Sequence, residues 1–291
     1  MLPMFRASLV GKTRNSLLIA FTIGIAALAV VGLAAHEFWV TAARWQVAPS
    51  GRLTILANVG SVFPAADSFT TPDRVASVRL VGPQTDLTIP PPYRREADSL
   101  AADIAAPSTP GTYVGVFAIR PRTAEKSGAV FEEHLKHQGL RQVAAERAAR
   151  GETAKAVRER YSRYGKTLIT VGSGGDRSAA TRPLGLKLEL VPLVDPTGLA
   201  AGSRLRVRLL LDGKPLPGAL AGAIYAGSKV APDQWPLTAV TDARGEAEFL
   251  LEHRGPWLVR AVTMQRREDE LGPDAADWET YWASLTFRLR Q

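Results

Sequence analysis

Short stretches in which apolar and polar residues alternate recur along most of the chain. Residues 52–59 alternate directly after a Pro-Ser-Gly turn, and residues 75–81, 112–119 and 166–171 show the same period. A period of two, bounded by turn residues, is typical of strands that bury one face against a core. The pattern therefore predicts antiparallel β-sheets over much of the first half of the chain.

The second half of the chain carries the same signal more densely. Residues 186–190 and 205–211 alternate cleanly, and the Asp212-Gly213 pair that follows is a strong hairpin turn. Further strands are expected at residues 219–225, 246–251, 257–262 and 284–289. About seven short strands in a segment of this length fit an immunoglobulin-like or transthyretin-like β-sandwich.

Residues 122–165 break the alternation. They are rich in Ala, Glu, Arg, Lys and Gln and contain no proline, and Phe131 and Leu135 recur at helical spacing. Gly139 and Gly151 are natural helix ends. We therefore predict a short helical insertion over residues 122–165.

A stretch rich in Gly, Ser and Ala near the middle of the chain carries little to bury and is the best linker candidate. We predict a mainly β fold of two β-sandwich domains, with the helical insertion in the first, after an N-terminal hydrophobic helix. The expected boundaries are residues 36–172 for the N-terminal β domain, 173–184 for the linker and 185–291 for the C-terminal β-sandwich domain.

The N-terminal segment indicates the compartment. Residues 17–35 form an uncharged, apolar run, and the residues before it carry three basic side chains and no acid. A basic flank, an apolar run and small residues at its end describe a secretory signal, and the run is also nearly long enough to span a membrane. We expect residues 1–35 to be a signal peptide or an uncleaved signal-anchor. The remainder would then lie in the periplasm or at the outer face of the cytoplasmic membrane.

Composition excludes several kinds of site. The chain has no cysteine, so disulfides, thiolate zinc sites and cysteine nucleophiles are ruled out. The formal net charge is +8, but the basic residues of the mature part are interspersed with acids. The arginines of residues 141–163 are better explained as a solvated helix face than as a nucleic-acid stripe, and we predict no nucleic-acid partner.

His36 is the strongest candidate for metal chemistry. If processing occurs directly before it or one residue earlier, the free α-amino group and the imidazole could together chelate nickel, cobalt or copper. Two ligands make a weak site, so the fold would have to supply more. The candidate metal ligands are His36, Glu37, His253, Asp277 and Glu279. In the alternative interpretation, His36 begins the first strand and packs beside Phe38 and Trp39.

Other candidate motifs favour structural explanations. His134 and His137 lie three residues apart on a predicted helix and are expected on a solvated surface. Residues 172–175 resemble a phosphate-binding loop, but no Lys-Ser or Lys-Thr follows them, so the linker interpretation is preferred. Trp278 and Tyr281 are expected in the core, with a ligand or partner surface as the alternative. No hydrolase elbow or dinucleotide fingerprint is present, and we predict that the protein is not an enzyme.

Three stretches together resemble a known family. They are His-Glu-Phe-Trp-Val at residues 36–40, the run at 159–166 that leads into a strand, and the tail that contains Gly-Pro-Trp at 255–257 and Asp-Trp-Glu at 277–279. In this order they resemble the bacterial domain of unknown function 4198 family. The resemblance implies an exported protein related to the periplasmic components of nickel and cobalt uptake systems. In that family a histidine commonly precedes the Met that follows Gly-Pro-Trp, whereas here that position is Thr263.

These observations favour an exported, non-enzymatic binding protein. The first hypothesis is transition-metal binding, of nickel or cobalt, or an accessory role in metal uptake beside membrane transporter components. An uncleaved N-terminal segment would also attach the protein to the membrane. The alternative is a structural or adhesion-like β-sandwich module that binds a protein or a carbohydrate without metal.

Overall fold

The computed structural model describes residues 36–230, 234–267 and 275–290. These residues belong to one compact unit. The predicted signal segment, residues 1–35, lies outside the described residues. None of the helices in the described ranges is long and apolar enough to cross a membrane.

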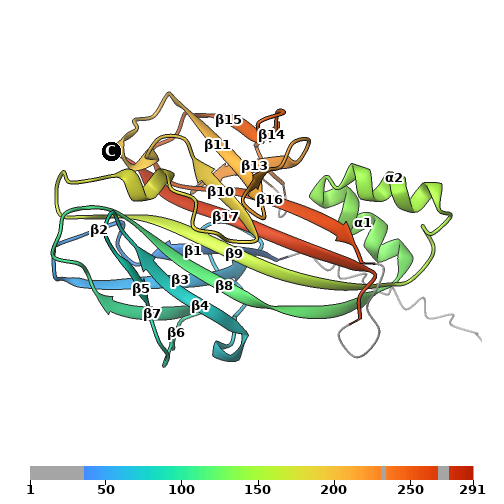
Figure 1. Cartoon of the computed structure of the whole chain (residues 1–291), viewed down its shortest axis with the longest axis horizontal. Helices are drawn as coiled ribbons and strands as arrows, with labels where there is room; N and C mark the ends of the chain where they lie inside the picture. The colour runs from blue at the N-terminus through green and yellow to red at the C-terminus, as the bar shows by residue number, and fades with distance from the viewer. Residues whose placement is uncertain (1–35, 231–233, 268–274, 291) are drawn as a thin grey trace, which may run out of the picture. The chain divides into compact units, whose positions relative to one another are not determined.

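A nine-stranded sheet runs through the centre of this unit (Figure 1). Its strands, in spatial order, are β14 (Leu237–Val240), β13 (Leu220–Tyr225), β16 (Gly255–Arg266), β17 (Trp278–Leu289), β9 (Val157–Val171), β8 (Gly111–Lys126), β4 (Val75–Val81) and β5 (Asp86–Thr88), and β2 (Gln46–Val47) pairs with β9 outside this order. Neighbouring strands are antiparallel except where β9 pairs with β17 and with β2.

One face of the central sheet is covered by a four-stranded sheet. Its strands are β1 (Glu37–Ala42), β3 (Arg52–Gly60), β7 (Ser99–Ala105) and β6 (Arg94–Glu96). A hydrophobic core lies between the two sheets, where Val40 and Ile55 meet Phe117 and Ile169. This core accounts for the alternation that the sequence showed in its first half.

The opposite face of the central sheet is covered by a second four-stranded sheet. Its strands are β10 (Leu188–Pro192), β11 (Ser203–Leu211), β12 (Lys214–Pro215) and β15 (Glu246–Leu251). Val116 of β8, next in sequence to Phe117, belongs to this second core together with Leu205 and Phe287. The mainly β fold with sandwich packing is confirmed, and the central sheet serves both sandwiches.

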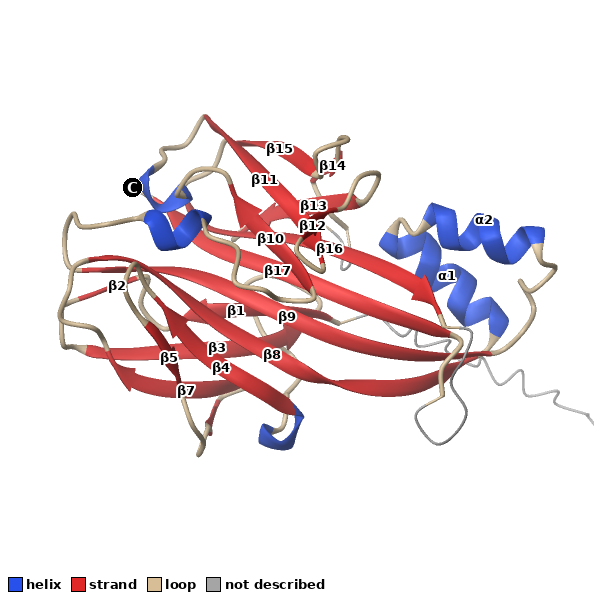
Figure 2. Ribbon diagram, in the orientation of Figure 1, coloured by secondary structure: helices blue, strands red, loops and turns tan. Residues whose placement is uncertain are grey.

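The helical insertion is shorter than predicted. The two helices are α1 (Gly128–Gln138) and α2 (Arg141–Ala149), whereas residues 122–126 continue β8 and residues 157–165 belong to β9. Composition suggested helix there, but the β8–β9 ladder extends to the pair Lys126–Val157 and satisfies the backbone of both stretches. Figure 2 shows both helices at the opposite end of β9 and β17 from β2. Three short 3-10 helices complete the fold: η1 (Pro72–Arg74), η2 (Ser178–Thr181) and η3 (Pro196–Gly198).

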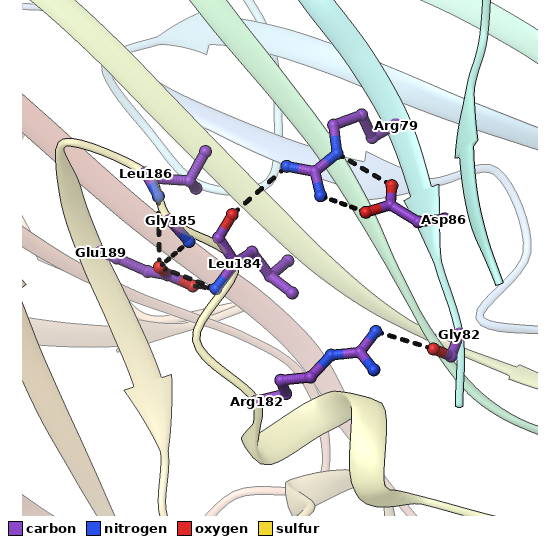
Figure 3. A network of polar contacts seen from close by, with 8 residues as sticks. All are labelled: Arg79, Gly82, Asp86, Arg182, Leu184, Gly185, Leu186 and Glu189. Atoms are coloured by element: carbon purple, nitrogen blue, oxygen red, sulfur yellow. Dashed lines mark hydrogen bonds and ion pairs between the residues drawn. The ribbon is translucent and has the colours of Figure 1, made fainter. Parts of the chain in front are cut away.

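The segment predicted as a linker packs onto both halves of the chain. Ala179 and Ala180 within it are buried. The Arg79 guanidinium pairs with Asp86 and donates to the Leu184 carbonyl at 3.3 Å (Figure 3). The Glu189 carboxylate accepts hydrogen bonds from the backbone N–H groups of residues 184–186. Polar contacts therefore fix this segment to both sequence halves.

The two halves also share backbone hydrogen bonds. β9 from the first half and β17 from the second pair in parallel, from Glu159 opposite Trp278 to Thr167 opposite Thr286. The sequence halves before and after residues 173–184 thus share one continuous sheet.

Candidate functional site

The first two predicted metal ligands lie in different surroundings. The His36 imidazole is partly exposed, and its Nε2 atom lies 3.8 Å from the Asp67 carboxylate. The Glu37 side chain points into the protein, where its carboxylate lies 3.8 Å from the guanidinium of Arg260. Glu37 is therefore a buried ion-pair partner, whereas His36 remains accessible.

The other three predicted ligands have structural contacts of their own. The His253 ring stacks on Tyr225 with 3.7 Å between centroids. Asp277 accepts a 2.8 Å hydrogen bond from the backbone N–H of Arg158. Glu279 pairs with two arginines, Arg160 and Arg267.

No three histidine, aspartate or glutamate side chains gather as a metal site anywhere in the described ranges. The five residues predicted as ligands are thus not brought together. In the part of the chain that the structure describes, these side chains therefore form no group of three that could hold a nickel or cobalt ion.

His134 lies in the interior, so the prediction of a solvated surface was wrong for this residue. Its Nε2 atom lies 3.6 Å from the Glu159 carboxylate, which also pairs with Lys126 and accepts a 2.5 Å hydrogen bond from Thr280. His137 lies on the surface as expected and contacts Glu133 at 3.1 Å. This buried polar cluster attaches α1 to the central sheet. The sequence analysis had placed His134 on a solvated helix surface.

The buried cluster predicts an acid-dependent loss of stability. Burial raises the pKa of Glu159, but the nearby His134 and Lys126 side chains outweigh it and lower the pKa from 4.5 to about 2. A depressed pKa gives stabilisation that is present above about pH 4.5 and is lost as the pH falls towards 2. Glu159→Gln should cost roughly 3 kcal/mol of unfolding free energy at neutral pH.

Urea unfolding checks this effect, with Glu133→Gln on the exposed face of α1 as the control for the lost charge. By about pH 3 the cost of Glu159→Gln should have fallen by more than half. An equal cost at both pH values would contradict the argument.

The predicted core position of the aromatic residues near the C-terminus is confirmed. Trp257, Trp278 and Tyr281 are all buried. Trp278 packs against Phe131 of α1, and Trp257 donates its indole N–H to the His253 carbonyl at 2.7 Å. The alternative of a ligand or partner surface at Trp278 and Tyr281 was wrong.

A hollow opens where the central sheet splits. The parallel pairing of β9 with β17 ends at Thr167 and Thr286. Beyond this point β9 pairs with β2, through Gln46 opposite Thr170. The end of β17 therefore separates from β9, and the space between them forms a hollow of about 700 Å³.

Four arginines line this hollow, which we call the arginine hollow. They come from three parts of the chain: Arg44 before β2, Arg177 before η2, and Arg288 and Arg290 at the end of β17. Arg44 and Arg290 are exposed, and Arg177 and Arg288 are half-buried. No aspartate or glutamate is among the described residues that line the hollow.

The four arginines differ from most others in having no ion-pair partner within the described part of the chain. Some exposed arginines elsewhere, such as Arg204, pair with a carboxylate, here Glu248 at 2.7 Å, whereas Arg254 is exposed and has no ion-pair partner in the described residues. Two acids close in sequence to the lining residues Arg177 and Thr197 are engaged otherwise. Asp176 accepts from the backbone N–H of Ser178, and Asp195 accepts from Thr112 and Thr197. The positive charge of the hollow is therefore not neutralised from within the described protein.

Uncharged groups complete the lining of the arginine hollow. Trp45 is half-buried there, and Gln46, Ser173 and Thr197 add amide and hydroxyl groups. The glycine-rich loop of residues 172–175 lies close against Pro110, because a Cβ at Gly175, where φ is +82°, would lie 2.1 Å from the Pro110 carbonyl oxygen. The stretch interpreted from the sequence as a linker thus forms one wall of the hollow.

Comparison with solved structures finds distant likenesses, three of which follow. The D0-D1 domain of Intimin is 12% identical over 86% of this chain and 97% of that one, with a TM-score of 0.21. The adhesin InvE of Yersinia pseudotuberculosis is 13% identical over 88% of this chain and 61% of that one, with a TM-score of 0.22. A Salmonella alpha-2-macroglobulin mutant is 10% identical over 87% of this chain and 15% of that one, with a TM-score of 0.23.

Sequence comparison is more specific. No curated protein matches the chain. The model of one family matches residues 33–265, which is most of the chain and agrees with the resemblance found in the sequence. The chain belongs to the family described as Domain of unknown function (DUF4198).

Proposed function

We propose that this protein is a non-enzymatic binding protein whose ligand is anionic and is held in the arginine hollow. One observation carries the proposal: four arginines from three separate segments face one hollow that no described carboxylate lines. Like charges gathered in this way repel one another, and an anion that enters between them relieves the repulsion. Guanidinium groups also bind carboxylates, sulfates and phosphates through paired hydrogen bonds.

The size and lining of the arginine hollow support a small anionic group or one unit of a larger ligand. Its volume of about 700 Å³ falls in the usual range of ligand sites. Trp45 gives an apolar surface, and Gln46 and Thr197 give uncharged hydrogen-bonding groups beside the charges. This combination favours the second sequence hypothesis, a module that binds its ligand without metal.

We place this binding outside the cytoplasm, in the periplasm or at the outer face of the membrane. The support is the basic and then apolar N-terminal segment of residues 1–35. Fractionation of cells with an antibody to the protein tests this compartment separately from the ligand.

Calorimetric titration of the purified protein with sulfate, galacturonate, neutral galactose and cationic spermidine tests the ligand class. Sulfate and galacturonate should bind and raise the unfolding temperature, and the other two should not. Arg177→Gln with Arg288→Gln should abolish this binding, whereas Arg204→Gln with Arg244→Gln, at exposed paired positions, should retain it. Equal binding by both double variants would contradict the proposal.

Gly198 offers a way to disturb the arginine hollow without removing a charge. A Cβ at this position would lie 2.3 Å from Nη1 of Arg177, the far end of a flexible side chain. We expect Gly198→Ala to displace the Arg177 guanidinium, to weaken sulfate binding severalfold and to leave the urea midpoint unchanged. Unchanged sulfate affinity would mean that Arg177 does not contact the anion.

Nickel or cobalt binding remains a hypothesis for the N-terminus. Its support in the described residues is the accessible His36–Asp67 pair, which with a freed α-amino group would supply three ligands. We expect only weak nickel binding, and we expect His36→Ala to remove it. Tight nickel binding that survives His36→Ala would point to a site outside the described residues.

A further inference from the structure

A second hollow adjoins the arginine hollow. It has a volume of about 420 Å³ and is lined by the segment before and after β2 together with the start of β3. Ala43, Arg44 and Gln46 line both hollows. The two hollows therefore share one short segment, and Arg44 lines both of them.

The chemistry of the second hollow differs from that of the first. Its other arginine, Arg52, pairs with Asp103 at 3.1 Å, and Thr54 donates to the same carboxylate at 2.5 Å. Asp103 also pairs with Arg94, and these contacts hold the pKa of its carboxyl well below the usual range. The second hollow thus borders a group of paired charges. Arg44 is its one arginine without an ion-pair partner in the described residues.

We infer that the two hollows form one extended site for an acidic polysaccharide, a chain in which carboxylate-bearing sugars alternate with neutral ones. This inference rests on the proposed function and names its ligand class. A carboxylate sugar occupies the arginine hollow, where the apolar face of its ring packs on Trp45. The polysaccharide then crosses Arg44, and a neutral sugar bonds to Gln46, which is exposed in the second hollow.

The distribution of charge favours a polysaccharide over a nucleic acid. A nucleic acid carries a phosphate on every unit, and single-stranded nucleic acids are bound by several aromatic side chains on which successive bases stack. Trp45 is the only aromatic side chain among the described residues that line the two hollows. Four unpaired arginines line the arginine hollow, whereas the second hollow has only one, Arg44, among its described lining residues. This distribution suits a ligand in which charged units alternate with uncharged ones.

Titration of the full-length protein with hyaluronan oligosaccharides tests this inference, because hyaluronan alternates a uronic acid with a neutral sugar. Lengthening the probe from a disaccharide to a hexasaccharide should raise the affinity about tenfold, with little further gain for longer chains. Ala48 is exposed and lines only the second hollow. Ala48→Glu should abolish the gain with length but leave the disaccharide affinity unchanged.

Ala148→Glu is the matched control, because Ala148 is exposed on α2 and the substitution adds the same negative charge. This variant should still bind the hexasaccharide more tightly than the disaccharide. Affinity that does not depend on length, or a gain that survives Ala48→Glu, would overturn the extended site while leaving the proposed anion binding intact. Tighter binding of a single-stranded DNA oligomer of equal charge would overturn the polysaccharide. Failure of both sulfate and the disaccharide to bind would overturn the proposed function itself.

Discussion

Lys166→Met is expected to lower the free energy of unfolding by about 3–5 kcal/mol. Lys166 and Glu189 form an ion pair of 2.8 Å in which each side chain is at most 2% exposed. Burial lowers the pKa of Lys166, and the adjacent Glu189 carboxylate opposes this shift. Methionine would leave a carboxylate buried without its cation, although the N–H groups of residues 184–186 would still contact it.

Denaturant unfolding measures this loss, and Lys187→Met provides the comparison. Lys187 pairs with Asp212 at 2.7 Å, but both side chains are substantially exposed, so this change should cost about 1 kcal/mol or less. If Lys166→Met cost no more than Lys187→Met, the buried pair would not hold the segment before β10 against the sheet.

Charge reversal in the arginine hollow is expected to have the largest effect on binding. Arg177→Glu with Arg288→Glu should weaken sulfate or galacturonate binding by a factor of a hundred or more. Each hydrogen-bonded charge contributes about 1.5–3 kcal/mol, and about 1.4 kcal/mol is a factor of ten. Neither arginine has an ion-pair partner in the described chain, so the folded protein should be destabilised little.

Calorimetric titration and thermal unfolding of the same sample separate these two effects. Arg204→Glu with Arg244→Glu reverses the same number of charges on the surface and should change affinity by less than tenfold. An equal loss in both double variants would mean that only the net charge of the protein attracts the anion.

Local patterns in the sequence predicted many individual strands well. The bounds expected for residues 75–81 and 246–251 match β4 and β15. Asp212 and Gly213 both have positive φ, as their hairpin turn requires. These elements are encoded by side chains close in sequence, and alternation was enough to find them.

Elements set by distant pairing were missed. β7 is rich in alanine and has weak strand propensity, but it pairs with β3 and β6. The outer part of β9, residues 157–165, is full of charged residues and was predicted as helix. It is a strand because β8 and β17 bind both of its edges. Nothing local in the sequence indicates that β17 will pair there.

The arginine hollow could not be predicted for the same reason. Arg44, Arg177 and Arg288 are far apart in the sequence and meet only because β2, β9 and β17 run parallel to one end of the sheet. The glycine-rich stretch of residues 172–175 was noticed, but the expected Lys-Ser or Lys-Thr was absent. The basic side chains beside it include Arg44, from the segment before β2, and Arg288 and Arg290, from the end of β17. His134 was misplaced because its partner Glu159 lies on a strand that was predicted as helix.

A crystal structure determined with selenate, an anomalously scattering analogue of sulfate, tests the binding site most directly. The account predicts the strongest anomalous peak in the arginine hollow, within hydrogen-bonding distance of the Arg177 and Arg288 guanidinium groups. A strongest peak elsewhere, for example beside Arg182, or no peak in the hollow at a selenate concentration that stabilises the protein, would contradict it.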